Sequence, residues 1–480
     1  MTHTKQKLAF PFWLITLSAV FGLTLTVLIQ DVMFQDAMAF SCVSHNMGIG
    51  IGTFWFPQYS TLNIDNIPSF HEQLPLVFGI QSVFYRLLGD SMYIERFYTF
   101  LIILLHIVFI SKLWRIIFKN KPEYNALAWL PVLFWIIIPV CFWSYRNNML
   151  ENTVSIFALI SILISYKQIH IQKNRIIPWL LSGFFIFLAS FSKGIAGFFP
   201  IVFPFLYWLI TRKISFKKSI YLSLILISVP LVIYLIFLIN PDSRQSLTIY
   251  FVDRFLKRVN TMPTADYRLE TAWRLFTEMI PILVFCAISL FFAKRTKLKS
   301  YVSENYKNFL LFVAIGLSGT LPLMLTMIQK GWYMVPAFPF FAIGFAILIT
   351  PAINAYLQNI DILNIRFKVF KAFSILLFIS VVIFITLQIG KISRSNEVVT
   401  DVYKIGTIVP KFSTITVPPE MYDQYDFKLQ GYLVRYFNIS ISPYKEYDYF
   451  LKEKKSNSLI PDKYDEEINL DLNVYELYKK

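Results

Sequence analysis

The chain has 480 residues, of which 56% are hydrophobic and only 15% are charged, and its formal net charge is +16. Soluble globular proteins carry roughly 25% charged residues, so this composition excludes an ordinary soluble enzyme and a disordered chain. Residues 391–480 hold 13 basic and 14 acidic residues, so the positive excess lies before residue 391. These basic residues lie in short loops between apolar runs. In such loops, basic residues set the orientation of a membrane protein and do not indicate binding of nucleic acid. The sequence therefore predicts a polytopic membrane protein.

The first apolar run follows Lys5 and Lys7 and lacks a clear small-residue cleavage site, so we expect a retained first helix. A spanning helix needs roughly 20 apolar residues. About eleven candidate spans follow along the chain, near 9–29, 97–117, 126–143, 152–166, 176–192, 195–210, 219–239, 277–293, 308–327, 333–351 and 370–390. The closely spaced pair 176–192 and 195–210 predicts a tight hairpin.

Residues 74–89 decide the predicted topology, because they are apolar but only about 16 residues long. If this segment crosses the membrane, the basic loops near 112–121, 167–175, 212–218, 294–299 and 366–371 all face outward. If it lies along the surface, all of them face the cytoplasm, as the positive-inside rule prefers. We therefore expect a juxtamembrane helix at 74–89, a cytoplasmic N-terminus and an extracytoplasmic C-terminus.

This topology divides the chain into two expected domains. Residues 1–390 form an all-α transmembrane domain whose external loop 30–96 carries juxtamembrane helices. Residues 391–480 have the composition of a small soluble α/β domain: 415–419 and 474–480 are typical of strands, and 421–437 of a helix or a strand. Three cysteines, Cys42, Cys141 and Cys286, lie far apart without a CxxC pair, which argues against a disulfide framework and a zinc site.

Ionisable residues at one membrane face are candidates for function, although structural charge pairs also occur. Asp36 follows the first span and precedes an amphipathic stretch, so it fits both a catalytic carboxylate and a helix N-cap. His71 and Glu72 precede a proline at the membrane face. They could contact a substrate as a pair. Equally, they could be ordinary residues of a solvated loop that precedes a helix beginning at a proline.

Two further external turns carry more polar groups than a connection requires. The turn WSYRNNMLENT places Arg146, Asn147, Asn148 and Glu151 between apolar runs. Lys193 lies in SKGIAGFFP among small residues. It fits a functional cation and, alternatively, a lysine whose side chain only reaches out to the membrane interface. Lys330 follows in QKGWYMVPAFP, after a loop at 240–276 rich in arginine. Cations on this face predict an anionic partner such as a lipid phosphate.

The ordered set DAMAF (36–40), residues 70–96, NNMLENT (147–153), SKGIAGFFP (192–200) and KGWYMVPAFPFFAI (330–343) resembles a known family. It is similar to bacterial polyprenyl-phosphate-dependent GT-C glycosyltransferases, in the protein mannosyltransferase-like branch (glycosyltransferase family 39 type) that includes the lipid A aminoarabinose transferases. The resemblance runs from residue 31 to about 350. It implies a GT-C fold in a bacterial inner membrane.

The resemblance also implies roles for single residues. Asp36 matches the family's first acid and would be the general base for the acceptor hydroxyl. Glu151 matches the second acid and would orient the acceptor or support Asp36. Asn147, Asn148 and Arg146 accompany Glu151, while Lys193 and Lys330, with Tyr333, match basic positions near the carrier phosphate. The family's Glu-(His/Lys)-Pro-Pro-Leu element reads Glu72-Gln73-Leu74-Pro75-Leu76 here, so its basic residue and first proline are missing.

The implied reaction moves a sugar from a polyprenyl phosphate, such as undecaprenyl phosphate, to a lipid A or glycolipid, surface glycan or protein acceptor, with inversion at C1. Such a donor carries an activated leaving group, so one base and nearby cations suffice. No DxD-like metal motif is evident, and we expect no cofactor, while a bound divalent metal stays open.

Two other classes of function fit a membrane protein of this composition. A transporter or flippase of lipid-linked saccharides usually has internal repeats and charges at the midplane, whereas here no repeat is visible and the charges lie at one face. A non-catalytic scaffold for envelope assembly predicts that Asp36, Glu151 and Lys193 are each replaceable.

Overall fold

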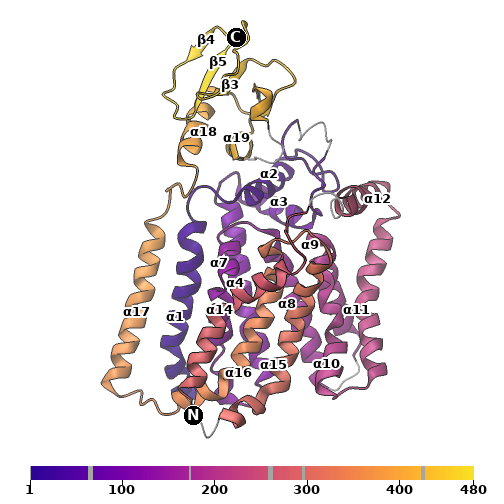
Figure 1. Ribbon diagram of the computed structural model, residues 1–480, viewed down its shortest axis with the longest axis vertical. Coiled ribbons are helices and arrows are strands. Elements are labelled where there is room, and N and C mark those ends of the chain that lie inside the picture. The colour runs from indigo at the N-terminus through magenta and orange to yellow at the C-terminus, as the bar shows by residue number, and fades with distance from the viewer. Residues whose placement is uncertain (1, 63–68, 172–174, 258–262, 294–297, 423–427) are drawn as a thin grey trace. The chain divides into compact units, whose positions relative to one another are not determined.

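The computed structural model describes all residues except 1, 63–68, 172–174, 258–262, 294–297 and 423–427 (Figure 1). Parts of the basic loops at 167–175 and 294–299 thus lie outside the described residues. The chain forms two compact units. Unit 1 comprises Met1–Thr26, Phe100–Arg146 and Leu150–Leu387, and unit 2 comprises Val27–Thr99, Asn147–Met149 and Gln388–Lys480.

The described elements of unit 1 are all helices. Its helices, two of which begin or end in unit 2, are α1 (Thr2–Leu28), α4 (Ile94–Ile117), α5 (Pro122–Asn125), α6 (Trp129–Ile137), α7 (Pro139–Tyr145), α8 (Leu150–Ile171), α9 (Ile177–Lys193), α10 (Phe203–Thr211), α11 (Phe216–Phe237), α12 (Pro241–Thr248), α14 (Glu270–Phe291), α15 (Leu298–Thr320), α16 (Phe338–Leu357) and α17 (Ile365–Thr386). Shorter 3-10 or π segments are η1 (Gly194–Val202), η2 (Ile249–Leu256), η4 (Leu321–Leu325) and η5 (Gly331–Ala337).

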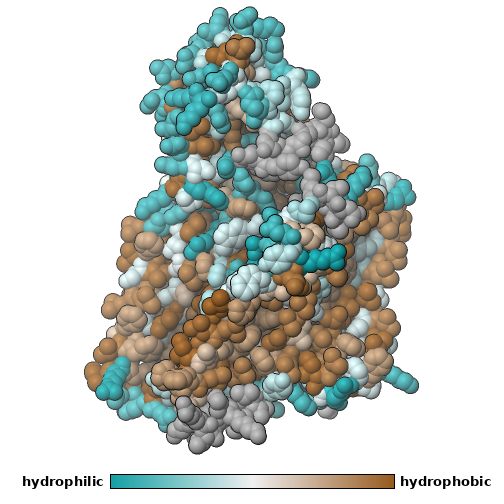
Figure 2. Space-filling view, viewed as in Figure 1, coloured by the Kyte–Doolittle hydropathy of each residue, from teal (hydrophilic) through white to brown (hydrophobic). Residues whose placement is uncertain are grey.

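Within the described residues, nine helices or continuous helical runs are long and apolar enough to cross a membrane. Most of α16 is buried inside unit 1, whereas very little of α17 is buried although it has high hydropathy. An exposed apolar helix is unfavourable in water and suits contact with lipid. Figure 2 shows hydrophobic side chains covering the sides of the unit 1 helices. The protein is therefore a multi-pass membrane protein.

The expected span 126–143 is not one continuous helix. Residues before proline avoid the helical region of backbone space, and Ile138 has ψ of 122° before Pro139, so α6 ends and α7 begins there. The Glu278 carboxylate accepts a hydrogen bond of 2.7 Å from the backbone N–H of Val140. It thereby satisfies one of the donors that the start of α7 leaves open.

The expected hairpin at 176–210 is present, although helical residues run without a break from α9 through η1 to α10. Gly194 has a positive φ of 67°, a conformation that other residues adopt at a cost. A Cβ on Gly197 would lie 2.3 Å from the carbonyl carbon of Ala189. In a straight helix, Ala189 and Gly197 would be about 12 Å apart along the axis. Because they are in close contact instead, the chain reverses direction between them, at Gly194.

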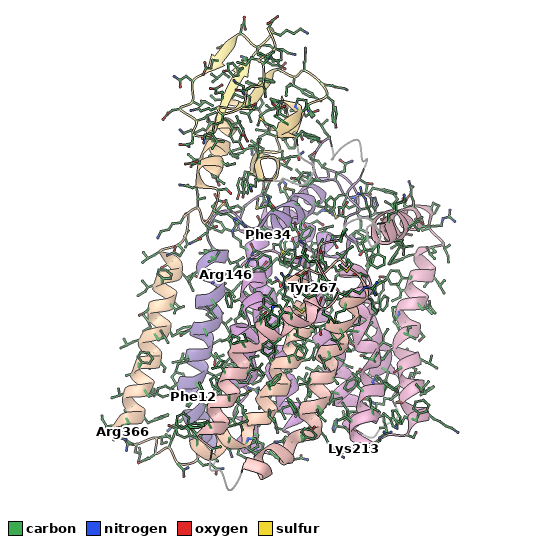
Figure 3. The ribbon with its side chains drawn as sticks, viewed as in Figure 1. Phe12, Phe34, Arg146, Lys213, Tyr267 and Arg366 are labelled. Carbon is green, nitrogen blue, oxygen red and sulfur yellow. The ribbon has the colours of Figure 1, made fainter. Side chains whose placement is uncertain are left out.

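The sequence predicts that the basic loops lie together at one end of unit 1. Figure 3 places Lys213 and Arg366, from two of the expected basic loops, at one end of the helices, and Arg146 and Tyr267 toward the other. α1 begins at the same end as Lys213 and Arg366 (Figure 1). This distribution agrees with the arrangement that the positive-inside rule predicts.

Unit 2 combines the segment after the first span with the C-terminal residues. Its helices are α2 (Gln35–Ile49), α3 (Leu76–Leu88), α18 (Asn396–Ile408) and α19 (Lys428–Phe437), with the 3-10 turn η6 (Pro419–Met421). α3, the expected juxtamembrane helix, has 13 residues and is about 20 Å long, too short to cross a bilayer core of about 30 Å. It packs against α2.

The C-terminal residues contain a five-stranded sheet of order β2-β1-β3-β5-β4, which confirms the small sheet domain expected there. The strands are β1 (Thr414–Thr416), β2 (Ser440–Ser442), β3 (Tyr449–Glu453), β4 (Glu466–Ile468) and β5 (Tyr475–Lys479). β1 pairs in parallel with β2 and β3, and β5 pairs antiparallel with β3 and β4. Of the segment 421–437, whose structure the sequence left open, the described C-terminal part is the helix α19.

Candidate functional site

A buried ion pair joins two helix ends of unit 1. Glu151 lies in the first turn of α8 and is 1% exposed, and Lys193 is the last residue of α9 and is 12% exposed. The Lys193 Nζ donates a hydrogen bond to Glu151 Oε1. An acid at a helix N-terminus and a base at a C-terminus are both favoured by the helix dipole, so the pair fits the two ends that hold it.

Aromatic side chains from η5 lie beside this pair. The Lys193 Nζ is 4.8 Å from the ring centroid of Tyr333. The neighbouring Trp332 stacks on Trp143 of α7 with ring centroids 5.3 Å apart. Because η5 also packs against α8, the sequence segments around 143, 151, 193 and 333, far apart in the chain, meet at one end of unit 1.

Lys330 immediately precedes η5 and is half-buried. Its Nζ lies 5.9 Å from the Trp332 ring, and no ion-pair partner for it is found in the described part of the chain. A third cation, Arg274 of α14, lies against Gly331 and pairs with Glu270 at 3.4 Å. The Lys193–Glu151 pair has no net charge, whereas Lys330 adds a positive charge to this region.

Arg146, the residue after α7, does not join the ion pair. Its Nε donates to the backbone oxygen of Leu23 at 2.6 Å, and its guanidinium lies 4.8 Å from the Phe142 ring. These contacts fix the end of α7 against α1. Arg146 belongs to unit 1, and the next residues, Asn147 and Asn148, belong to unit 2.

Asp36 lies in the first turn of α2, within unit 2, and is half-buried. The residue at the N-cap position is Phe34, so Asp36 is not the N-cap that its sequence position also allowed. The backbone N–H of Phe34 donates to Asn147 Oδ1 at 2.8 Å. Asn147 therefore takes over the capping role and holds the backbone two residues before Asp36.

Asn148 is 1% exposed, and both the oxygen and the nitrogen of its side-chain amide form hydrogen bonds within the protein. It exchanges two hydrogen bonds of 2.8 Å with the Gln81 amide, and its nitrogen also donates to Ser41 at 3.1 Å. A fully satisfied buried amide pair fixes the geometry of the helices that contribute it. These contacts hold the 147–149 turn to α2 and α3.

His71 is 3% exposed, and both of its ring nitrogens are engaged. Nε2 lies 3.1 Å from the carbonyl oxygen of Trp55, which can only accept, so Nε2 carries the proton. In the neutral ring Nδ1 then accepts from the Ser69 hydroxyl at 2.9 Å. These bonds keep His71 as a packed loop residue, while its neighbour Glu72 is half-buried.

Unit 2 contains a buried charge network that the sequence did not reveal. Arg435 of α19 is 2% exposed and contacts Glu95 at 3.0 Å and Asp90 at 3.2 Å. His45 lies 3.0 Å from Asp90 and, as the largest cause, lowers the pKa of that carboxyl to about 2. Asp31 forms a second group with Tyr403 and Tyr436. The partners of Arg435 and of Asp31 lie more than 300 residues away in the chain, and no local pattern predicts them.

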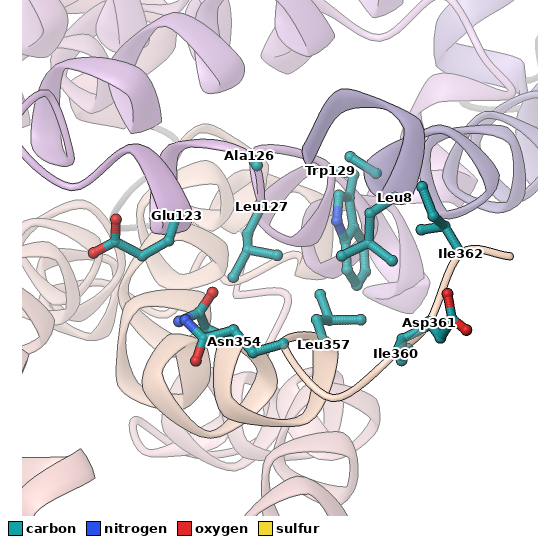
Figure 4. A pocket seen from close by; sticks show the side chains of 12 residues that line it. Leu8, Glu123, Ala126, Leu127, Trp129, Asn354, Leu357, Ile360, Asp361 and Ile362 are labelled. Carbon is teal, nitrogen blue, oxygen red and sulfur yellow. The ribbon is translucent and has the colours of Figure 1, made fainter. Parts of the chain in front are cut away.

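A cavity of about 330 Å³ lies in unit 1 near the start of α1 and the end of α16 (Figure 4). Leu127, Trp129 and Leu357 contribute to its mostly apolar lining, and none of the predicted site residues does. Within the described residues, no group of three or more His, Cys, Asp or Glu side chains is arranged to hold a metal ion.

Comparison with known proteins shows which chains are similar to this one. The model of the dolichyl-phosphate-mannose-protein mannosyltransferase family matches residues 72–237, about a third of the chain. A search of curated protein sequences finds no match. The crystal structure of ArnT from Cupriavidus metallidurans bound to undecaprenyl phosphate is similar, with a TM-score of 0.58 and 14% identity, over 90% of this chain and 85% of that one.

The apo structure of the same ArnT matches with the same TM-score and identity, over 88% of this chain and 83% of that one. Identity this low establishes the fold alone. The fold is of the GT-C, ArnT-like type, and the resemblance to polyprenyl-phosphate-dependent glycosyltransferases of the protein mannosyltransferase and ArnT type is confirmed.

Proposed function

We propose that the protein is an integral membrane glycosyltransferase that moves a sugar from a polyprenyl-phosphate carrier to an acceptor on the extracytoplasmic face. The observation that carries this proposal is the Glu151–Lys193 pair beside Tyr333, with Lys330 on the same segment as Tyr333. Partly buried cations at the end of a helical membrane unit suit a lipid-linked phosphate. The ArnT structure of the same fold holds undecaprenyl phosphate.

In the proposed reaction, the acceptor hydroxyl oxygen attacks C1 of the sugar while Asp36 takes its proton. The bond between C1 and the phosphate oxygen breaks, and its electron pair leaves with the polyprenyl phosphate. Direct displacement inverts the configuration at C1. One base and one set of cations suffice because the phosphate is already a good leaving group.

The cations have distinct tasks in this proposal. Lys330, which has no acidic partner in the described residues, attracts the phosphate of the donor. Lys193, held by Glu151, stays in a fixed position and stabilises the charge that develops as the phosphate departs. A preorganised charge does not need to reorient during the reaction, so it stabilises the transition state more than a mobile one. Glu151 is thus assigned to orient Lys193.

The proposed setting is the bacterial inner membrane, with the N-terminus in the cytoplasm and residues 391–480 outside. The Arg146 end of unit 1 is then extracytoplasmic, because Lys213 and Arg366 lie at the other end (Figure 3). The transferred sugar is a hexose or a pentose. The acceptor is a lipid A or other glycolipid, a surface glycan or a protein.

The function is tested with purified protein in nanodiscs and a panel of hexosyl and pentosyl undecaprenyl phosphates. Extracted envelope glycolipids and glycans serve as acceptors. We expect sugar to appear on an acceptor in an amount equal to the undecaprenyl phosphate released. Movement of labelled donor across the bilayer of proteoliposomes, without any release of undecaprenyl phosphate, would instead establish a transporter.

A further inference from the structure

The backbone just before Asp36 is held by the C-terminal region of the chain. Asp31 is 4% exposed, and its carboxylate accepts hydrogen bonds from the hydroxyls of Tyr403 in α18, at 2.5 Å, and Tyr436 in α19. Arg96 lies 4.0 Å from the same carboxylate. We call Asp31, Tyr403 and Tyr436 the Asp31 clamp.

The main chain at Asp31 is held in the same way. Its N–H donates to the carbonyl oxygen of Lys391 at 2.7 Å, and its own carbonyl oxygen accepts from the Ser393 hydroxyl at 3.1 Å. Side chain and backbone of one residue are therefore both tied to the segment 391–436. Only four residues separate Asp31 from Asp36, so movement at this anchor is carried directly into the first turn of α2.

Val32, the next residue, has a positive φ of 72°. A β-branched side chain is strongly disfavoured in this conformation, which persists only where the surrounding structure enforces it. The backbone N–H of Val32 donates to Asp31 Oδ1 at 2.7 Å, so the clamped carboxylate is the group that fixes this turn. After this turn, the backbone N–H of Phe34 is held by its hydrogen bond to Asn147.

The two tyrosines are suited to act as permanent donors. Their rings stack with centroids 5.6 Å apart and planes within 10°. Burial and the charge of Asp31 raise the pKa of both hydroxyls, so they stay protonated at any physiological pH. Arg435, next to Tyr436, anchors α19 to Glu95 and Asp90, so the helix that carries Tyr436 is itself fixed.

From this geometry we infer that Tyr403 and Tyr436 are positioning residues for the proposed base. Through Asp31 they set the strained turn at Val32 and, with it, the place of the Asp36 carboxylate. The C-terminal region is then a required part of the catalytic apparatus, whose α18 and α19 complete the first external loop. This inference rests on the proposed function, since it assigns a purpose to the position of Asp36.

The test compares the double variant Y403F/Y436F with wild type and with Tyr464→Phe. Tyr464 is a matched control because it is 3% exposed, lies in the same C-terminal region and donates from its hydroxyl to the Tyr447 oxygen at 2.8 Å. Transfer is measured in nanodiscs over a range of donor concentrations. Amide hydrogen exchange of residues 31–40 is measured in parallel.

We expect the double variant to lose at least tenfold in kcat with donor KM changed less than twofold, and to exchange faster at residues 31–40. Tyr464→Phe should change neither. The inference is overturned if the double variant keeps wild-type kcat, if Tyr464→Phe lowers kcat equally, or if exchange at residues 31–40 is unchanged. The exchange arm does not depend on glycosyl transfer, so it separates failure of the clamp from failure of the proposed function.

Discussion

Lys193 and Glu151 close a hydrogen-bonded ion pair between the C-terminal end of α9 and the N-terminal end of α8. Buried pairs of this kind add little stability by themselves, because desolvation offsets their attraction. Their presence at a membrane-protein helix end is therefore more informative about function than about folding. The fold brings together two helix ends whose dipoles favour these two charges.

The pair allows its contributions to stability and to activity to be separated. Lys193→Met leaves a buried carboxylate without its cation, and we expect it to cost about 3–5 kcal/mol of unfolding free energy. Adding Glu151→Gln removes the stranded charge and should recover most of the melting temperature. Sugar transfer should stay at least a hundredfold below wild type in both variants. Recovery of transfer in the double variant would show that Lys193 has only a structural role.

Lys330 should act mainly on donor binding. Replacing it with Gln removes the cation that has no acidic partner in the described residues, and we expect about a tenfold weaker affinity for undecaprenyl phosphate, or about 1.4 kcal/mol. Lys257→Gln is the matched control, since Lys257 is exposed and already paired with Asp253 at 2.6 Å. Equal losses in both variants would point to a general loss of surface charge.

Acid should weaken unit 2 through Asp90. The pKa of its carboxyl is lowered to about 2, chiefly by His45, whose Nε2 lies 3.0 Å away. Partial burial opposes this shift, and Arg435 adds to it. Because the folded pKa lies below the ordinary value of about 3.9, the stabilisation is complete above that pH and is lost as pH falls toward 2. The fall in melting temperature between pH 5 and pH 2 should be smaller in Asp90→Asn than in wild type. Identical slopes would contradict this role.

The hairpin of α9 and η1 depends on the missing side chain of Gly197. A Cβ there would meet the backbone of Ala189 and Ser190 at 2.3 Å, and backbone cannot yield as a side chain can. Gly197→Ala should cost about 2 kcal/mol or more. Gly22→Ala should not lower the melting temperature, because its Cβ would make ordinary contacts of 3.6 Å with Val381 and alanine favours a helix more than glycine does. Melting temperatures of the two purified variants check this, and equal values would refute the tight reversal.

Apolar periodicity and loop charge predicted the membrane character, the hairpin and the short helix at 76–88, because those features depend on local sequence. The same apolar pattern hid the break before Pro139, since hydropathy is insensitive to backbone conformation. The sequence singled out Glu151 and Lys193 as polar residues in apolar surroundings but did not pair them. The packing of α8 against α9 brings the two side chains together.

Two other groups needed the tertiary structure. Asn148 was a candidate for substrate contact, yet its amide bonds to Gln81, which no local pattern connects with it. Arg435 and Tyr436 lie in a segment whose helical structure was itself open from sequence. Their partners Glu95 and Asp31 are more than 300 residues away, so only long-range folding reveals the network.

The most direct test of the proposed mechanism is the transfer rate of Asp36→Asn in nanodiscs with the donor that wild type uses. Asparagine keeps the size of the side chain but cannot accept the proton. We predict at least a thousandfold lower kcat, with melting temperature and undecaprenyl phosphate affinity close to wild type. Transfer by this variant at the wild-type rate would contradict the assignment of Asp36 as the base.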